Sequence, residues 1–221
     1  MEKYSDALLQ CPLFAGIDRI GLKSLLDCVH ASKRAYGRGS FIFMEAERIG
    51  FVGALLSGSL HIIQEDFWGN RSILARVEPP EIFAEAFACA GLERSPVSVV
   101  AVEDCEVLAM DFKKIVAICP QSCAFHARLI ENMLGVLARK NVSLVRKLEH
   151  VAKRGTRGKL LSYLSSRALE EGADSFDIPF KRQELADYLS VDRSAMSSEM
   201  SKMRKEGLLS FYREHFQLLK H

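Results

Sequence analysis

The sequence has no long hydrophobic run, and no stretch approaches the roughly 18 apolar residues that a membrane-spanning helix needs. Its first residues, Met1 to Asp6, are polar and of mixed charge, without the basic and then apolar segments of a secretory signal. Neither sign of charge predominates, since 30 Lys and Arg stand against 28 Asp and Glu. We therefore expect a cytoplasmic chain with no membrane partner.

Cysteine and histidine are also scarce, with six of each. Without an export signal the cysteines are expected to be reduced thiols. Cys119 and Cys123 are four residues apart, but one such pair is weak evidence for a metal. Cys11-Pro12 and Cys119-Pro120 are pairs of a kind sometimes seen near haem, so a redox or haem response stays open. The sequence shows no catalytic motif, and we expect neither an enzyme nor a metal site.

Positive charge is concentrated in the last third of the chain. Residues 153–221 contain 13 Lys and Arg and 10 Asp and Glu, whereas residues 1–152 contain 17 and 18. A mildly basic segment suggests nucleic acid as a partner without establishing it.

The first half of the chain has the pattern of β structure. Residues 7–30 show helical spacing broken by Pro12 and Gly16, and short apolar runs follow from Tyr36 to Asp111. Turn residues separate these runs at intervals of about ten residues, as in all-β domains. Many short strands at this spacing predict a jelly roll or barrel.

A heptad pattern follows, from about Ser122 to Val151. Apolar residues at this spacing are close to the signature of a two-stranded coiled coil, and the polar exception, Asn141, could set the register. The helix could instead pack this stripe on its own domain, but we favour a dimer. The predicted interface residues are Ile130, Leu134, Leu137, Asn141, Leu144, Leu148 and Val151.

A basic junction over residues 153–158 is a candidate hinge, and residues 159–169 have a helical pattern. Residues 182–200 then fit two short helices joined by a turn around Ser190, the spacing of a helix-turn-helix. Asp192 is a good N-cap for the second helix. Residues 208–219 read as a β-hairpin wing. An ordinary helical hairpin shares this spacing, but the wing and the long helix favour DNA binding.

The second helix would turn Met196 and Met200 inward and present basic and hydroxyl side chains outward. Arginine can bond guanine in a bidentate manner, and serine can bond bases or phosphates. Glu199 stands where this motif usually has an apolar residue, although Met203 could supply the packing. The predicted DNA-contacting residues are Arg182, Gln183, Arg193, Ser194, Ser197, Ser198 and Lys202.

The order of a β roll, a long helix and a winged helix-turn-helix resembles the Crp/Fnr superfamily of bacterial transcription regulators over nearly the whole chain. Local phrases are similar too: Pro12-Leu13-Phe14, Tyr36-Gly37-Arg38-Gly39, and Arg182 to Ala186 at the start of the helix-turn-helix. Residues 82–96 look like the family's effector-binding cassette. The resemblance implies that Glu85 bonds a ribose hydroxyl, and that Arg94 and Ser95 hold a cyclic phosphate.

This sequence departs from the family pattern in several places. Ala84 replaces a glycine, Pro96 replaces a small residue, and the interval from Glu85 to Arg94 is one residue short. Leu144 and Val145 stand where a cyclic AMP binder offers hydroxyls to adenine, so the effector could be a cyclic nucleotide or another anion. Arg94 could instead form a surface ion pair. The outward face of the second helix also differs from that of well-known subgroups of the family, so we expect it to recognise a different DNA sequence.

The fold class we expect is α+β: an N-terminal double-stranded β-helix (jelly roll), a long dimerisation helix and a C-terminal winged helix-turn-helix. The predicted domains are an effector-sensing β roll at 1–121, the dimerisation helix at 122–152 and the DNA-binding domain at 153–221. We expect a homodimeric, sequence-specific regulator that binds double-stranded DNA, with RNA polymerase as a further candidate partner and no certain cofactor beyond a small-molecule effector. The alternative is a ligand-sensing dimer whose winged domain binds a protein instead.

Overall fold

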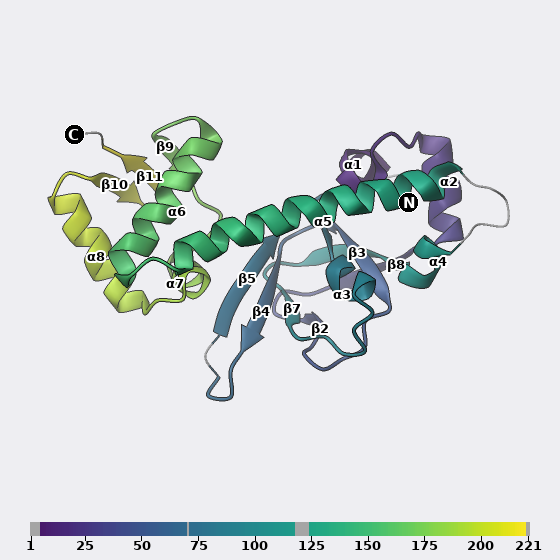
Figure 1. Cartoon of the computed structure of the whole chain (residues 1–221), viewed down its shortest axis with the longest axis horizontal. Coiled ribbons are helices and arrows are strands. Elements are labelled where there is room, and N and C mark those ends of the chain that lie inside the picture. Colours follow the sequence, from purple (N-terminus) through teal and green to yellow (C-terminus); the bar gives the residue numbers. More distant parts are fainter. Residues whose placement is uncertain (1–4, 70, 118–123, 220–221) are drawn as a thin grey trace. The chain divides into compact units, whose positions relative to one another are not determined.

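The computed structural model describes residues 5–69, 71–117 and 124–219 (Figure 1). The chain divides into two compact units, Met1–Asn70 with Leu74–Lys140 and Arg71–Ile73 with Asn141–His221. The predicted α+β class is confirmed, with a β roll, a long helix and a winged helix-turn-helix. None of the described helices combines the length and apolar character that crossing a bilayer requires.

The first unit is built on two four-stranded sheets, with strand orders β1-β8-β3-β6 and β2-β7-β4-β5. The pairings of β8 with β1 and β3, of β7 with β2 and β4, and of β3 with β6 are antiparallel, as expected for a jelly roll. The strands are β1 (Ser32–Tyr36), β2 (Phe41–Phe43), β3 (Phe51–Ser57), β4 (Leu60–Glu65), β5 (Arg71–Val77), β6 (Ile82–Phe83), β7 (Ser98–Ala101) and β8 (Cys105–Asp111).

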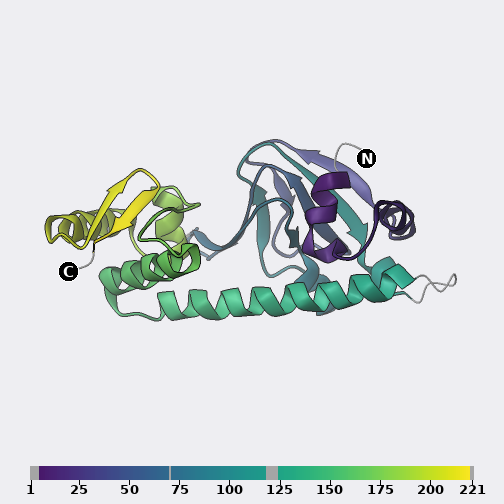
Figure 2. The same cartoon turned by 90° about the horizontal axis from the view of Figure 1, so that it is seen from above.

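Helices cover part of this roll. They are α1 (Ser5–Gln10), the 3-10 turn η2 (Pro12–Phe14), α2 (Arg19–Cys28), α3 (Glu85–Cys89), α4 (Phe112–Val116) and the first half of α5 (Ala124–Val151). Figure 2 shows this half of α5 running along the roll. Leu129, Met133 and Val136 form its buried stripe and pack with residues of α2 and β3 in one core cluster. Hydrophobic burial therefore holds α5 to the first unit up to Lys140.

A second core cluster fills the space between the two sheets with apolar side chains from both. Alternating residues point inward along the strands, which is why the sequence shows short apolar runs instead of one long one. The pattern did not predict β1, β6, α3 or α4. β6 and the two helices are very short, and most residues of β1 are exposed.

The second unit is the winged helix-turn-helix. Its elements are the C-terminal part of α5, α6 (Gly155–Glu171), β9 (Ser175–Asp177), α7 (Arg182–Leu189), α8 (Arg193–Lys205), β10 (Leu209–Tyr212) and β11 (His215–Leu218). The strands form an antiparallel sheet in the order β10-β11-β9. Leu164, Leu185, Met200 and Phe216 are among its fully buried side chains.

The expected junction over residues 153–158 is shorter in the structure. Helix α5 ends at Val151 and α6 begins at Gly155, so residues 152–154 connect them and four residues of the expected hinge are helical. Gly155 has φ +68°, which glycine adopts without strain. The two glycines that suggested a loop are therefore used at the first turn of a helix.

Candidate nucleic-acid interface and effector cassette

Helices α7 and α8 meet through a tight turn at Ser190. This residue has φ +52° and ends α7, and its N–H donates to the carbonyl groups of Ala186 and Asp187. Two residues later, Asp192 caps α8, and its carboxylate accepts a hydrogen bond of 2.7 Å from the Ala195 N–H. The bond from the Ser194 hydroxyl and, next, this cap lower the pKa of Asp192, because both stabilise the charged carboxylate. The N-terminus of α8 is thereby held in a defined direction.

One side of α8 is buried and the other carries the predicted contact residues. Met196, Met200 and Met203 are fully buried, which confirms the inward packing expected for the first two. Arg193, Ser194, Ser198 and Lys202 are exposed on the helix and Ser197 is half-buried. The Ser194 hydroxyl donates to Asp192 at 2.5 Å, so it also supports the cap. A cationic, hydroxyl-bearing face of this kind suits phosphate and base contacts.

Glu199, which departs from the usual pattern of the motif, has a structural role. Its side chain is 18% exposed, and its carboxylate lies 3.4 Å from Arg157 on α6 and 3.6 Å from Lys202. Arg157 also donates to Glu206 at the end of α8 and lowers the pKa of that carboxyl. The Glu199 carboxylate therefore connects α8 to α6. Met203, which is fully buried, supplies the apolar packing that Glu199 does not.

Two predicted DNA-contacting residues are engaged within the domain. The Arg182 guanidinium lies over the rings of Phe211 and Phe216, at 5.1 and 5.7 Å, and donates to the Arg213 carbonyl. Burial lowers its pKa. Gln183 donates to Asp187 at 2.8 Å. Arg182 thus joins α7 to the wing, and a DNA contact by either residue stays a prediction.

Two further exposed cations, one in the last turn of α8 and one on the wing, were missed by the sequence reasoning. Arg204 lies 5.0 Å from the centroid of Phe211, and Arg213 lies 5.4 Å from that of Tyr212 at the hairpin turn. The pair Arg213-Glu214 between two apolar runs was the available signal. These arginines extend the cationic surface from α8 to the wing.

The heptad face of α5 is exposed in the single chain, although its opposite face is buried. Leu134 and Leu148 are each 64% exposed, and Ile130 and Leu144 are exposed as well. Asn141 is also exposed, and Leu137 and Val151 are half-buried. The exposed leucines at heptad spacing are not covered by their own domain, so the face is available to another surface.

The cassette holds a buried ion pair. Glu85 is 2% exposed, and its Oε1 lies 2.8 Å from the Lys140 ammonium of α5, which also donates to the Ile82 carbonyl at 2.5 Å. Oε2 of Glu85 is buried without a hydrogen-bond partner among the described residues. Ala84 occupies the left-handed region at φ +66°, where the family has glycine. Nothing in the sequence indicated Lys140 as the partner of Glu85.

The other two cassette residues are engaged elsewhere. The exposed Arg94 donates to the Ala46 carbonyl at 3.1 Å, which differs from the ion pair that the sequence left open. The buried Ser95 hydroxyl donates to the Val97 carbonyl at 2.6 Å and accepts from the Val97 N–H. The structure brings Arg94 and Ser95 together in one loop, and each has a protein partner in place.

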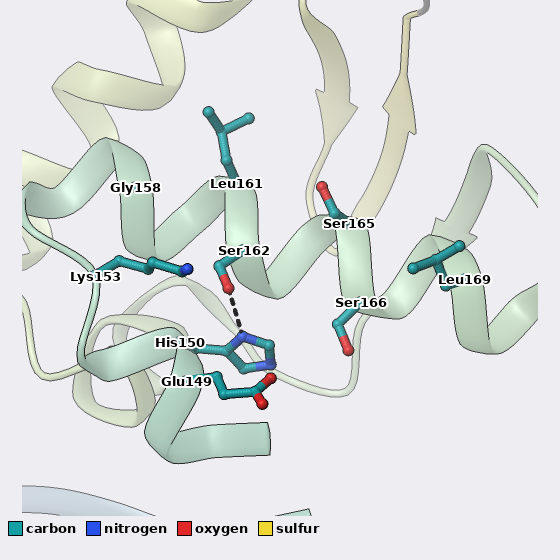
Figure 3. Close-up of a pocket in the computed structure, with 9 residues that line it drawn as sticks. All are labelled: Glu149, His150, Lys153, Gly158, Leu161, Ser162, Ser165, Ser166 and Leu169. Carbon is teal, nitrogen blue, oxygen red and sulfur yellow. Dashed lines mark hydrogen bonds between the residues drawn. The ribbon is translucent and has the colours of Figure 1, made fainter. Parts of the chain in front are cut away.

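An open hollow of about 490 Å³ lies in the second unit between the end of α5 and α6 (Figure 3). His150 is only 6% exposed at its edge, and its Nδ1 lies 2.9 Å from the Ser162 hydroxyl. Burial lowers the pKa of His150, because it disfavours the imidazolium. This hydrogen bond joins the last turns of α5 to α6, the first complete helix of the second unit. Within the described residues, no group of three metal-ligating side chains is present, and Cys119 and Cys123 lie outside them.

Two family models match the chain in the order in which these surfaces occur. Residues 33–122 match the cyclic nucleotide-binding domain, and residues 158–221 match the Crp-like helix-turn-helix domain. The chain is thus a two-domain protein of the regulator class, with a sensor-type roll followed by a helix-turn-helix. It belongs to the Crp/Fnr family of regulators, as the sequence resemblance predicted.

Solved structures share this fold. The c-di-GMP responsive global regulator CLP of Xanthomonas campestris is 19% identical, with 92% of this chain and 100% of that chain covered and a TM-score of 0.74. FixK2 from Bradyrhizobium japonicum is 17% identical, with coverages of 85% and 92% and a TM-score of 0.64. TTHB099, a CRP-family transcriptional regulator from Thermus thermophilus, is 19% identical, with coverages of 85% and 92% and a TM-score of 0.60. No curated protein matches the chain significantly in sequence.

Proposed function

We propose that the chain is a homodimeric, sequence-specific DNA-binding regulator of transcription whose affinity for DNA is set by a small molecule bound in the N-terminal roll. The observation that carries the proposal is the outward face of α8. It presents Arg193, Ser198 and Lys202 to solvent on a helix whose other face is sealed by methionines. A capped helix with such a face has the features that entry into the major groove requires.

The exposed heptad face of α5 supports the homodimer. Two copies packed through Leu134, Leu144 and Leu148 would bury side chains that a single chain leaves in water. Asn141 would meet its counterpart near the middle of this seam and favour one register. A dimer would also present two copies of α8, and paired recognition helices about 34–36 Å apart read successive turns of the major groove.

The cassette supports an anionic effector with a hydroxyl group. The orphaned Oε2 of Glu85 is a buried acceptor that a ligand hydroxyl would satisfy, while Lys140 holds Oε1. Arg94 is exposed and could turn from the Ala46 carbonyl to a phosphate, because an ionic bond is stronger than one to a carbonyl. Cyclic mononucleotides fit this chemistry. Since CLP is described as c-di-GMP responsive, cyclic dinucleotides belong to the same class of candidates.

The test begins with selection of bound duplexes from a randomised pool by the full chain. Fluorescence anisotropy then compares a selected duplex with a scrambled one. Arg193→Ala should lower the preference for the selected duplex by about 1–3 kcal/mol, the contribution of one bidentate arginine–guanine contact. The matched control is Arg128→Ala, which removes an exposed arginine of α5.

Unchanged discrimination by Arg193→Ala would refute its proposed role in base recognition. No selected sequence and no salt-dependent DNA binding by the intact chain would refute the proposed function itself. In that case, a protein partner of the winged domain would become the reading to pursue.

A further inference from the structure

Cys28 and His126 form a thiol–imidazole pair outside the cassette and the helix-turn-helix. Cys28 is the last residue of α2 and is exposed, whereas His126 lies in the first turn of α5 and is 6% exposed. The Cys28 Sγ and the His126 Nε2 are 3.8 Å apart. The His126 Nδ1 is buried and has no hydrogen-bond partner among the described residues. The imidazole therefore has its Nε2 directed at the thiol.

The other described cysteines are in different surroundings. Cys11 is 1% exposed and burial raises its pKa to about 11, and Cys105 is also buried. Cys89 is exposed, but its thiol lies 3.6 Å from the Met133 sulfur, and burial together with the charge of Glu85 raises its pKa. Among the described thiols, Cys28 combines exposure with a nearby base.

This combination gives a cysteine nucleophilic character, because the thiolate is the reactive form and a neighbouring imidazolium stabilises it. The position at the end of α2 works against the thiolate, since the C-terminal end of a helix carries partial negative charge. The imidazole of His126 must therefore outweigh this effect if it is to activate Cys28. Substitution of His126 should abolish the activation of Cys28.

We propose that Cys28 is a modification site for small disulfides, with His126 as the base that activates it. The Cys28 thiolate attacks one sulfur of the disulfide, so that a new S–S bond forms and the original S–S bond breaks. The leaving sulfur departs as a thiolate and takes the proton that His126 accepted from Cys28. One disulfide and one protein thiol thus become a mixed disulfide and one small thiol, with no other reactant.

The location connects the site to the helix packing of the first unit. Helix α2 lies against the start of α5, and a Cβ on Gly21 would come within 2.5 Å of the Phe125 ring. Cys28 lies seven residues further along α2 and meets His126, the residue that follows Phe125. The proposal rests on the Cys28–His126 geometry alone and does not depend on the proposed function.

The experiment measures the rate at which oxidised glutathione modifies each cysteine, by peptide mass spectrometry of the full chain with Cys119→Ser and Cys123→Ser. We expect Cys28 to react about threefold faster than Cys89 or more, because one pKa unit of thiolate stabilisation raises the thiolate fraction tenfold while the lower nucleophilicity of that thiolate offsets about a factor of three. His126→Asn should remove that advantage and leave the rate at Cys89 unchanged. His30→Gln is the matched control, because it removes an exposed imidazole two residues after Cys28.

Two results would overturn the proposal. One is an equal rate at Cys28 and Cys89 in the protein with His126 intact, which decides the matter even if His126→Asn does not fold. The other is a Cys28 rate that is unchanged or higher in His126→Asn. Loosened packing would make Cys28 still more accessible and raise its rate, so a purely structural role for His126 predicts the opposite direction.

Discussion

Gly53 and Phe83 form a close contact that positions the effector cassette. The two residues are paired across β3 and β6, and the Phe83 ring lies so near that a Cβ on Gly53 would overlap its Cζ. Phe83 is fully buried and directly precedes Ala84 and Glu85. A glycine on β3 thus admits an aromatic ring that places the following carboxylate next to Lys140 of α5.

Gly53→Ala should lower the free energy of unfolding by about 1–3 kcal/mol, since an added methyl overpacks a filled core. Denaturant unfolding followed by circular dichroism measures this. Gly50→Ala is the matched control, because a Cβ there would meet nothing within 4 Å. Equal stability of the two variants would show that the Phe83 ring can move aside.

Helix α5 has two apolar faces that differ in their exposure to solvent. One face, with Leu129 and Met133, is buried on the roll, and the heptad face, with Leu134 and Leu148, is exposed. Folding of one chain satisfies the first face only. The helix can therefore bind its own domain and a second copy at once, because the two stripes occupy different sides of it.

Leu134→Glu should dissociate the proposed dimer with little change in the folding of the monomer. Each leucine buried in the proposed seam contributes about 1.5–3 kcal/mol to the stability of the dimer, and the dimer contains two copies of the substituted position. Sedimentation equilibrium measures the oligomeric state. Val142→Glu changes an exposed valine on the same helix that is not one of the predicted seam residues, and it should leave the dimer intact. A wild-type chain that sediments as a monomer would refute the seam.

For the whole molecule, the proposed function requires the roll to influence DNA binding. A ligand can do this only if it binds one conformation of the regulator more tightly than another. Lys140 is well placed to take part, because it contacts Glu85 and the Ile82 carbonyl while it belongs to the helix that carries the proposed seam. Occupation of the cassette would change the surroundings of this lysine.

Thermal unfolding with cyclic AMP, cyclic GMP and cyclic di-GMP tests the cassette. A ligand at one hundred times its Kd adds about 2.7 kcal/mol of stability, and each kcal/mol raises the Tm by roughly 2–4 °C for a chain of this size. We expect such a rise with one of these nucleotides and its loss in Arg94→Ala. Arg48→Ala, which changes another exposed arginine, is the control. No rise with any of the three would exclude them as effectors and direct the search to other anions.

The sequence by itself determined the features that depend on near neighbours along the chain. The helix-turn-helix, the Asp192 cap and the exposed heptad stripe follow from spacing and residue type, because a helical turn or a cap involves residues only a few positions apart. The tertiary structure decided which distant side chains meet: Lys140 with the Ile82 carbonyl 58 residues away, Arg157 with Glu199 42 residues away, and Cys28 with His126 98 residues away. Such pairs have no periodic signal, since they depend on how whole elements pack. The cassette residues stay a prediction from the sequence, and the side chains and carbonyl groups that they contact were decided by the tertiary structure.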